Sequence, residues 1–176
     1  MRVIGGKWRG RALVAPRGRD TRPTADRVRE ALFSILGDVE GDRVLDLFAG
    51  SGALAIEALS RGASGATLVD SAPAAVTAIR RNLAALGVEA EVVRQRASVY
   101  LERARADGRQ YDLVFLDPPY HQANVLGREL SEALVAVLGQ GARVVAESDR
   151  RAPLELELPL LVDRRYGDTL IQIYGS

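Results

Sequence analysis

A carboxylate, two prolines and an aromatic ring follow the apolar run 111–116, in the order Asp117-Pro118-Pro119-Tyr120. Ligands bind at strand ends in open α/β sheets, and proline fixes the backbone while removing an amide donor. The segment therefore offers two hydrogen-bond acceptors, the Asp117 carboxylate and the Pro118 carbonyl, beside the flat ring of Tyr120. Such a set suits a planar ring that carries an exocyclic amino group. The alternative is a strand that simply ends in a turn.

A second group of residues lies upstream, where Gly50-Ser51-Gly52 separates an apolar strand from a helix. Glycines let the backbone approach a ligand closely, because a Cβ at either position would block it. With Ala55 the turn matches the G-x-G-x-x-G/A pattern, and Asp70 ends the next strand, where it can accept from ribose hydroxyls. This fits NAD or S-adenosylmethionine. Asp46 favours the latter, because a carboxylate would repel pyrophosphate but suits a cationic amino-acid group.

Basic side chains are concentrated near the N-terminus. Residues 1–30 contain nine basic and three acidic side chains, although the whole chain carries a net charge of only +1. The other residues are mildly acidic on balance. This asymmetry predicts a polyanion-binding arm, residues 1–40, on a second unit formed by residues 41–176. The alternative is a solvated basic tail.

Missing residue types exclude several kinds of site. The chain has no cysteine, which excludes disulfides, thiolate zinc sites and cysteine nucleophiles, and its single histidine, His121, excludes a multi-histidine metal centre. It also lacks a run of about 18 apolar residues, and its first residues lack the apolar core of a signal peptide. We therefore expect a soluble cytoplasmic protein with no bound metal and no membrane partner.

The N-terminal arm should contain a hairpin and a helix. Two short apolar stretches, 3–4 and 12–14, are joined by a glycine-rich basic segment, which predicts a β-hairpin. Trp8 near its tip could stack on a base or pack on the body of the protein. Thr24 is predicted to be the N-cap of a helix that runs to Leu36 and stops at Gly37.

Strands and helices then alternate, which predicts a largely parallel, twisted sheet with right-handed crossovers. We expect an antiparallel hairpin at the end, 160–166 and 169–174, around Gly167-Asp168. Ser71 is predicted to be the N-cap of the second body helix. The expected body strands are 44–48, 66–70, 89–94, 112–116 and 142–147, and the expected helices are 53–61, 73–86, 98–106 and 124–138.

Together these residues resemble a known family. Segments 44–53 and 117–120 resemble the class I, Rossmann-like amino-methyltransferases. Segments 2–11, 22–33 and 166–169 more specifically resemble the bacterial guanine-N2 methyltransferases of small-subunit (16S) ribosomal RNA, the RsmD family. The resemblance covers essentially the whole chain, but the glycine turn and Asp-Pro-Pro-Tyr are shared by many DNA, RNA and protein methylases.

The resemblance implies a fold and a cofactor. The expected fold is α/β, with a seven-stranded, mostly parallel sheet that ends in the antiparallel hairpin, and the expected methyl donor is S-adenosylmethionine, with S-adenosylhomocysteine as product. One departure is that the acidic residue usually found near the adenine is absent from segment 94–98, so adenine recognition would fall to backbone groups or Ser98. The expected cofactor-binding residues are Asp46, Ala49, Gly50, Gly52, Asp70, Ser71, Ala97, Ser98 and Asp117.

The implied reaction is methylation of the exocyclic N2 amino group of a guanine in 16S rRNA, within an assembling 30S subunit. Asp117 and the Pro118 carbonyl would orient the amino group in a near-attack geometry of about 3 to 3.5 Å. Asp117 would then accept the proton, while Tyr120 stacks on the unstacked base. The expected substrate-binding residues are Lys7, Trp8, Arg9, Arg11, Arg22, Thr24, Pro119, Tyr120 and His121.

Other functions remain open. A DNA amino-methyltransferase would share the donor site, but 176 residues leave little room for a target-recognition region. A non-catalytic RNA-binding module is disfavoured by the intact Gly50, Gly52, Asp70 and Asp117. Asp117 also disfavours a protein glutamine methylase, which prefers asparagine there, and a nicotinamide oxidoreductase lacks an evident proton relay. Length and polar surfaces predict a monomer.

Overall fold

The computed structural model describes residues 1–16, 26–118 and 130–176. Predictions made for five residues therefore lie outside the described residues: Arg22, Thr24, Pro119, Tyr120 and His121. None of the helices within the described ranges is long and apolar enough to cross a lipid bilayer.

The described residues form a seven-stranded sheet with the order β3-β2-β1-β4-β5-β7-β6. Strands β1 to β5 pair in parallel, and β7 pairs antiparallel with both β5 and β6. This confirms the predicted sheet and its antiparallel C-terminal pair. The strands are β1 (Arg43–Leu47), β2 (Gly65–Val69), β3 (Glu91–Val93), β4 (Tyr111–Leu116), β5 (Leu138–Asp149), β6 (Leu160–Tyr166) and β7 (Thr169–Gly175).

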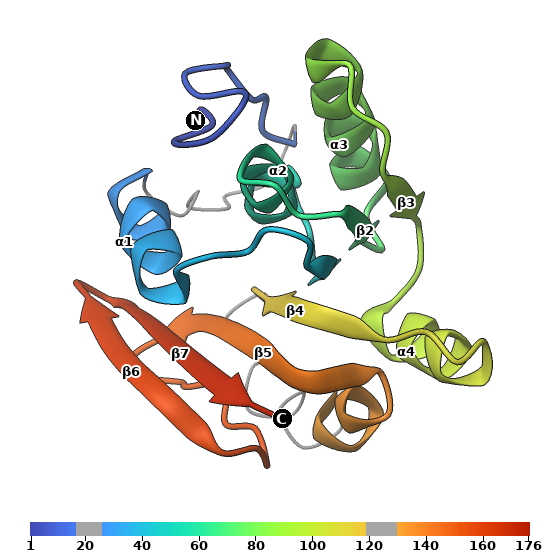
Figure 1. The fold of residues 1–176 in the computed structure, drawn as a ribbon, viewed down its shortest axis with the longest axis vertical. Helices are drawn as coiled ribbons and strands as arrows, with labels where there is room; N and C mark the ends of the chain where they lie inside the picture. Colours follow the sequence, from blue (N-terminus) through green and yellow to red (C-terminus); the bar gives the residue numbers. More distant parts are fainter. Residues whose placement is uncertain (17–25, 119–129) are drawn as a thin grey trace.

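Helices cover both faces of this sheet. As Figure 1 shows, α1, α2 and α3 lie on one face, whereas α4 and the helical residues 130–135 lie on the other. This three-layer arrangement is what right-handed crossovers between parallel strands require. The helices are α1 (Asp26–Leu36), α2 (Ala53–Ser60), α3 (Pro73–Leu86) and α4 (Ala97–Ala106).

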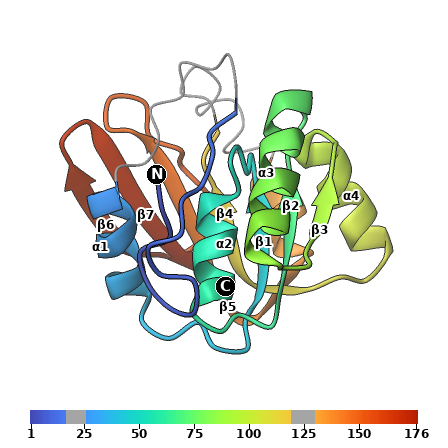
Figure 2. The ribbon, with the colours of Figure 1, turned by 90° about the horizontal axis from the view of Figure 1, so that it is seen from above.

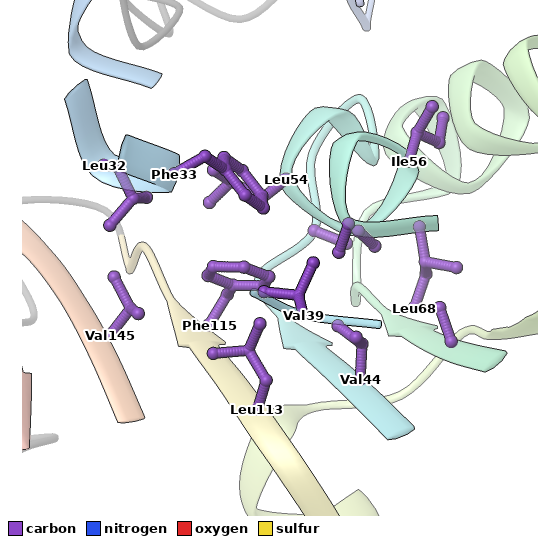
Figure 3. Close-up of a cluster of buried hydrophobic side chains, with 14 of the residues drawn as sticks. Leu32, Phe33, Val39, Val44, Leu54, Ile56, Leu68, Leu113, Phe115 and Val145 are labelled. Atoms are coloured by element: carbon purple, nitrogen blue, oxygen red, sulfur yellow. The ribbon is translucent and has the colours of Figure 1, made fainter. Parts of the chain in front are cut away.

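The core is divided between the two faces. On the first, Phe115 of β4 meets Phe33 of α1 with ring centroids 5.9 Å apart, and residues of α2 and β2 complete the cluster drawn in Figure 3. On the second, Tyr100 and Leu101 of α4 pack against β1 and β4. Burial of this kind contributes roughly 1.5–3 kcal/mol for each large apolar side chain.

Several predicted boundaries need correction. Ser71 is not the N-cap of α3: that position is Ala72, and Ser71 is exposed. The predicted helix 124–138 ends at residue 135, because the chain turns and β5 already begins at Leu138. Strand β3 is shorter than predicted and β5 is longer. Pairing with neighbouring strands, which local sequence does not reveal, sets these limits.

The predicted N-terminal hairpin is confirmed in outline. Arg2 and Ala12 form an antiparallel bridge, and the Val3 N–H donates to the Arg11 carbonyl at 2.9 Å. Figures 1 and 2 show this segment lying over α2, between α1 and α3. Val3 and Leu13 are buried in the same apolar cluster as α1 and α2. The hairpin is therefore packed on the body of the protein.

Candidate active site

The carboxyl ends of the parallel strands bring the predicted donor and acceptor residues to one edge of the sheet. The chain leaves β1 toward β2 on one side, whereas β4 lies on the other side of β1. A reversal of strand order of this kind is where ligands bind in open α/β sheets. Asp46 lies near the end of β1, Asp70 directly follows β2, and Asp117 directly follows β4. The structure thus brings together three carboxylates that are far apart in sequence.

The two glycines of the turn have different roles. Gly50 and Gly52 both have positive φ, 57° and 77°. Among residues 1–16, 26–118 and 130–176, a Cβ on Gly50 would have only the Phe48 carbonyl within 4 Å, at 3.9 Å, so these residues leave space beside it for a ligand. A Cβ on Gly52 would lie 2.8 Å from Cδ2 of Leu68 in β2. Gly52 therefore also lets the turn pack closely on the sheet, and close approach of its backbone to a ligand stays a prediction.

Asp70 holds the glycine turn in place. Its Oδ2 accepts the Gly50 N–H at 2.9 Å, and its Oδ1 accepts the Ala72 N–H at 2.8 Å. The second bond fixes the residue that precedes α3, whose N-cap Ala72 makes no side-chain capping bond. Each carboxylate oxygen can accept more than one hydrogen bond, so a bond to a ribose hydroxyl stays a prediction for Asp70.

Asp46 is a buried carboxyl with a perturbed charge state. Its side chain is 2% exposed, and its Oδ2 accepts the Ala55 N–H at 3.2 Å. Burial raises the pKa of Asp46 to about 7, and the nearby Asp70 adds to this, while the bond from Ala55 opposes it. Desolvation disfavours an isolated negative charge. The site is therefore poised to receive a positive charge, which would restore the ionised form.

Asp117 has a second acidic neighbour that the sequence analysis missed. Leu116 of β4 pairs with Ala146 of β5, so Asp117 and Glu147 follow side by side on adjacent strands. Burial raises the pKa of Asp117 well above its usual range, with further contributions from Glu147 and then Asp46. Glu147 is 4% exposed. Asp117 was selected because an acidic residue follows an apolar strand. Glu147, at the end of the predicted strand 142–147, could have been selected for a similar reason.

The remaining predicted cofactor residues lie along the same edge. The Ala49 N–H donates to the Val69 carbonyl at 3.0 Å, which ties the turn to β2. Segment 94–98 connects the end of β3 to α4, whose N-cap is Arg96. Ala97 is buried there and Ser98 is exposed. Pro118 is buried, next to Asp117.

The basic side chains of the arm lie on the surface. Lys7, Arg9 and Arg11 are exposed. Trp8 is partly buried against the core, with the Lys7 ammonium 5.5 Å from its ring centroid, so the ring packs on the body. Nη2 of Arg11 donates to the Ala85 carbonyl of α3 at 2.8 Å. Arg11 therefore anchors the arm as well as adding charge, whereas Arg9 is the simpler cation to test.

A buried glutamate fastens the arm to α2, and sequence reasoning missed it. Glu57 is fully buried, and its two carboxylate oxygens accept the N–H groups of Ile4 and Gly5 at 2.7 and 2.8 Å. It also accepts from Nε of Arg61 at 2.9 Å, and Nε of the buried Arg29 lies 3.9 Å away. The signal was present as a single charged residue within the apolar helix Ala53–Ser60.

Known proteins resemble this chain over its length. The family model described as "Conserved hypothetical protein 95" matches residues 1–175. The chain is 39% identical to "Putative rRNA methyltransferase YlbH" of Bacillus subtilis (strain 168), over 99% of this chain and 98% of that protein. It is 47% identical to "Ribosomal RNA small subunit methyltransferase D" of Escherichia coli (strain K12), over 69% of this chain and 61% of that protein.

Solved structures share the fold. "Putative methyltransferase yhhF" from Escherichia coli superposes with a TM-score of 0.84 at 36% identity, over 99% of this chain and 97% of that one. A hypothetical protein of Thermus thermophilus superposes with a TM-score of 0.86 at 34% identity, over 100% of this chain and 99% of that one. The fold is that of the class I methyltransferases, as the sequence predicted.

Proposed function

The chain belongs to the family described as Conserved hypothetical protein 95, and from this membership we propose that it transfers a methyl group from S-adenosylmethionine to the N2 amino group of a guanine in 16S rRNA. Curated relatives named as small-subunit rRNA methyltransferases support the substrate. The observation that carries the proposal is the position of Asp117 and Pro118 at the strand edge beside the glycine turn.

The residues at the turn fit S-adenosylmethionine. The described residues leave space beside Gly50 for close approach of a ligand, and Asp70 fixes the turn through two backbone N–H groups. The buried Asp46 carboxyl favours a cationic ligand, because a positive charge offsets the desolvation of its ionised form. Asp46, Gly50 and Asp70 would hold the cofactor, with Ala97 and Ser98 near its adenine. When bound, it supplies an electrophilic methyl group.

Asp117 and the Pro118 carbonyl would orient the guanine amino group that receives the methyl group. An exocyclic amino group is a weak nucleophile because its lone pair is delocalised into the ring. Two acceptors can hold its N–H groups so that the lone pair points toward the donor, and orientation of this kind can supply much of the rate acceleration. The ionised form of Asp117 is the acceptor, so its raised pKa predicts activity that increases with pH.

The arm binds the nucleic acid in this proposal. Lys7 and Arg9 are exposed and lie on a segment that packs on α2, on the sheet face shared with α1 and α3. Phosphate contacts from such residues position a nucleic acid and make its binding depend on salt. Residues 1–40 would therefore form the RNA-binding unit, and residues 41–176 the catalytic unit, of a monomer.

Transfer of labelled methyl from S-adenosylmethionine to 30S particles tests the proposal. The particles come from cells that lack the enzyme, and the product nucleosides are identified by mass analysis. We expect label in N2-methylguanosine of 16S rRNA. Asp117→Ala should abolish turnover and leave cofactor affinity within a few fold, whereas Glu89→Gln, at an exposed carboxyl, should match the wild type. Label in duplex DNA and none in rRNA would overturn the substrate, and no transfer would favour a binding module.

A further inference from the structure

One buried amide joins the arm to the glycine turn. Asn82 of α3 is 2% exposed. Its Nδ2 donates to the Ser51 carbonyl at 2.9 Å and to the Val14 carbonyl at 3.0 Å, and its Oδ1 accepts the Val14 N–H at 2.8 Å. All of these bonds are of normal length. A single side chain thus satisfies backbone groups of two segments that have different tasks in the proposed function.

The two segments lie at the two binding sites. Ser51 is the middle residue of the glycine turn, between Gly50 and Gly52. Val14 lies just after the hairpin that carries Lys7 and Arg9. A weaker contact supports the same connection, because Oγ of Ser51 lies 3.7 Å from Sδ of Met1. The arm therefore touches the turn that is expected to hold the cofactor.

We propose that Asn82 is a positioning residue that couples RNA binding on the arm to cofactor binding at the glycine turn. This inference rests on the proposed function. Loss of either set of bonds leaves buried polar groups unsatisfied, which is unfavourable. A ligand that orders the turn therefore favours the docked arm, and a ligand that orders the arm favours the formed turn. Coupling of this kind is reciprocal in its effect on the two affinities.

Other anchors of the arm provide a matched control. Oγ of Ser60 in α2 accepts the Trp8 N–H at 2.9 Å and donates to the Gly5 carbonyl at 2.6 Å. These bonds hold the arm without contacting Ser51. Ser60→Ala should therefore weaken docking of the arm without removing the connection to the turn, whereas Asn82→Ala removes that connection directly.

The test measures the affinity for S-adenosylhomocysteine with and without a saturating 16S rRNA hairpin. In the wild type and in Ser60→Ala we expect the RNA to tighten cofactor binding by about fivefold or more, and the cofactor to tighten RNA binding by the same factor. In Asn82→Ala the factor should fall to about one, with both ligands still binding. A wild-type factor in Asn82→Ala, or no coupling in the wild type, would overturn the inference. Failure of the wild type to bind either ligand would instead overturn the proposed function.

Hydrogen exchange on the native protein tests the same inference if Asn82→Ala does not fold. Saturating S-adenosylhomocysteine should slow exchange of the Val14 amide, which is bonded to Asn82, by about fivefold or more, the same coupling factor. It should slow exchange of the Trp8 amide, which is bonded to Ser60, by a smaller factor. An equal effect on both amides, or none on Val14, would show that the turn does not communicate with the arm through Asn82.

Discussion

Replacement of Asp46 by asparagine should make the protein more stable at pH 8 while weakening cofactor binding. The carboxyl is 2% exposed, and burial raises its pKa from 3.8 to about 7. Asparagine has nearly the same shape, can still accept the Ala55 N–H through Oδ1, and carries no charge that must be desolvated. The wild type keeps this unfavourable charge because, in the proposed function, it attracts a cation.

The magnitude follows from the pKa difference between the two states. The folded state holds the proton more tightly, so between about pH 4 and pH 7 the free energy of unfolding falls as the pH rises. One pKa unit corresponds to about 1.4 kcal/mol, and a shift from 3.8 to about 7 therefore amounts to about 4 kcal/mol at pH 8. Below about pH 4 the carboxyl is protonated in both states and makes no difference.

Urea unfolding at pH 5, 6, 7 and 8 measures this effect. The stability of Asp46→Asn relative to the wild type should increase from pH 5 to about pH 7, and level off by pH 8. Burial of the new amide changes the stability of the variant by the same amount at every pH, so it does not alter the pH dependence of the difference. Glu89→Gln, at an exposed carboxyl, controls for the loss of one charge. A stability difference that is the same at every pH would refute the reasoning, and unchanged binding of S-adenosylhomocysteine would refute the role of Asp46 in the cofactor site.

The other predictions concern the second acid and the arm. Glu147→Gln removes a repulsive neighbour and should lower the pKa of Asp117, so the acidic limb of the methyl-transfer rate should move to lower pH; an unmoved limb would mean that Glu147 does not act on Asp117. Arg9→Ala should weaken RNA binding and reduce the slope of log affinity against log salt by about one. An unchanged salt slope would exclude a phosphate contact at Arg9.

Local sequence determined the elements of this fold. Apolar strands that alternate with helical segments require a parallel sheet, and Gly167 with Asp168 between two extended runs requires a hairpin, which is β6 and β7. Gly37, with φ of 70°, stops α1 as expected. These features depend on neighbours in the chain, and so they can be predicted from short windows of sequence.

The edge of the sheet that carries the proposed cofactor site could be predicted because its residues lie at the end of a strand or soon after it. Asp46, the glycine turn, Asp70 and Asp117 were expected at one edge, and the parallel pairing of β1, β2 and β4 places them there. Glu147 could have been predicted there as well, because it ends the predicted strand 142–147. In contrast, only the folded structure shows that a Cβ on Gly52 would collide with the side chain of Leu68.

Tertiary structure decided which polar groups become partners. Asn82 bonds to Val14 and Ser51, which are 68 and 31 residues away, and Glu57 bonds to Ile4 and Gly5 across more than 50 residues. No pattern of types or spacing specifies such pairs, because a buried side chain bonds to whatever backbone group packing brings within reach. The sequence by itself therefore determined the sheet, the turn and the chemistry of its edge. Only the folded chain determined how the basic arm is fastened to that edge, since this depends on close packing between distant segments.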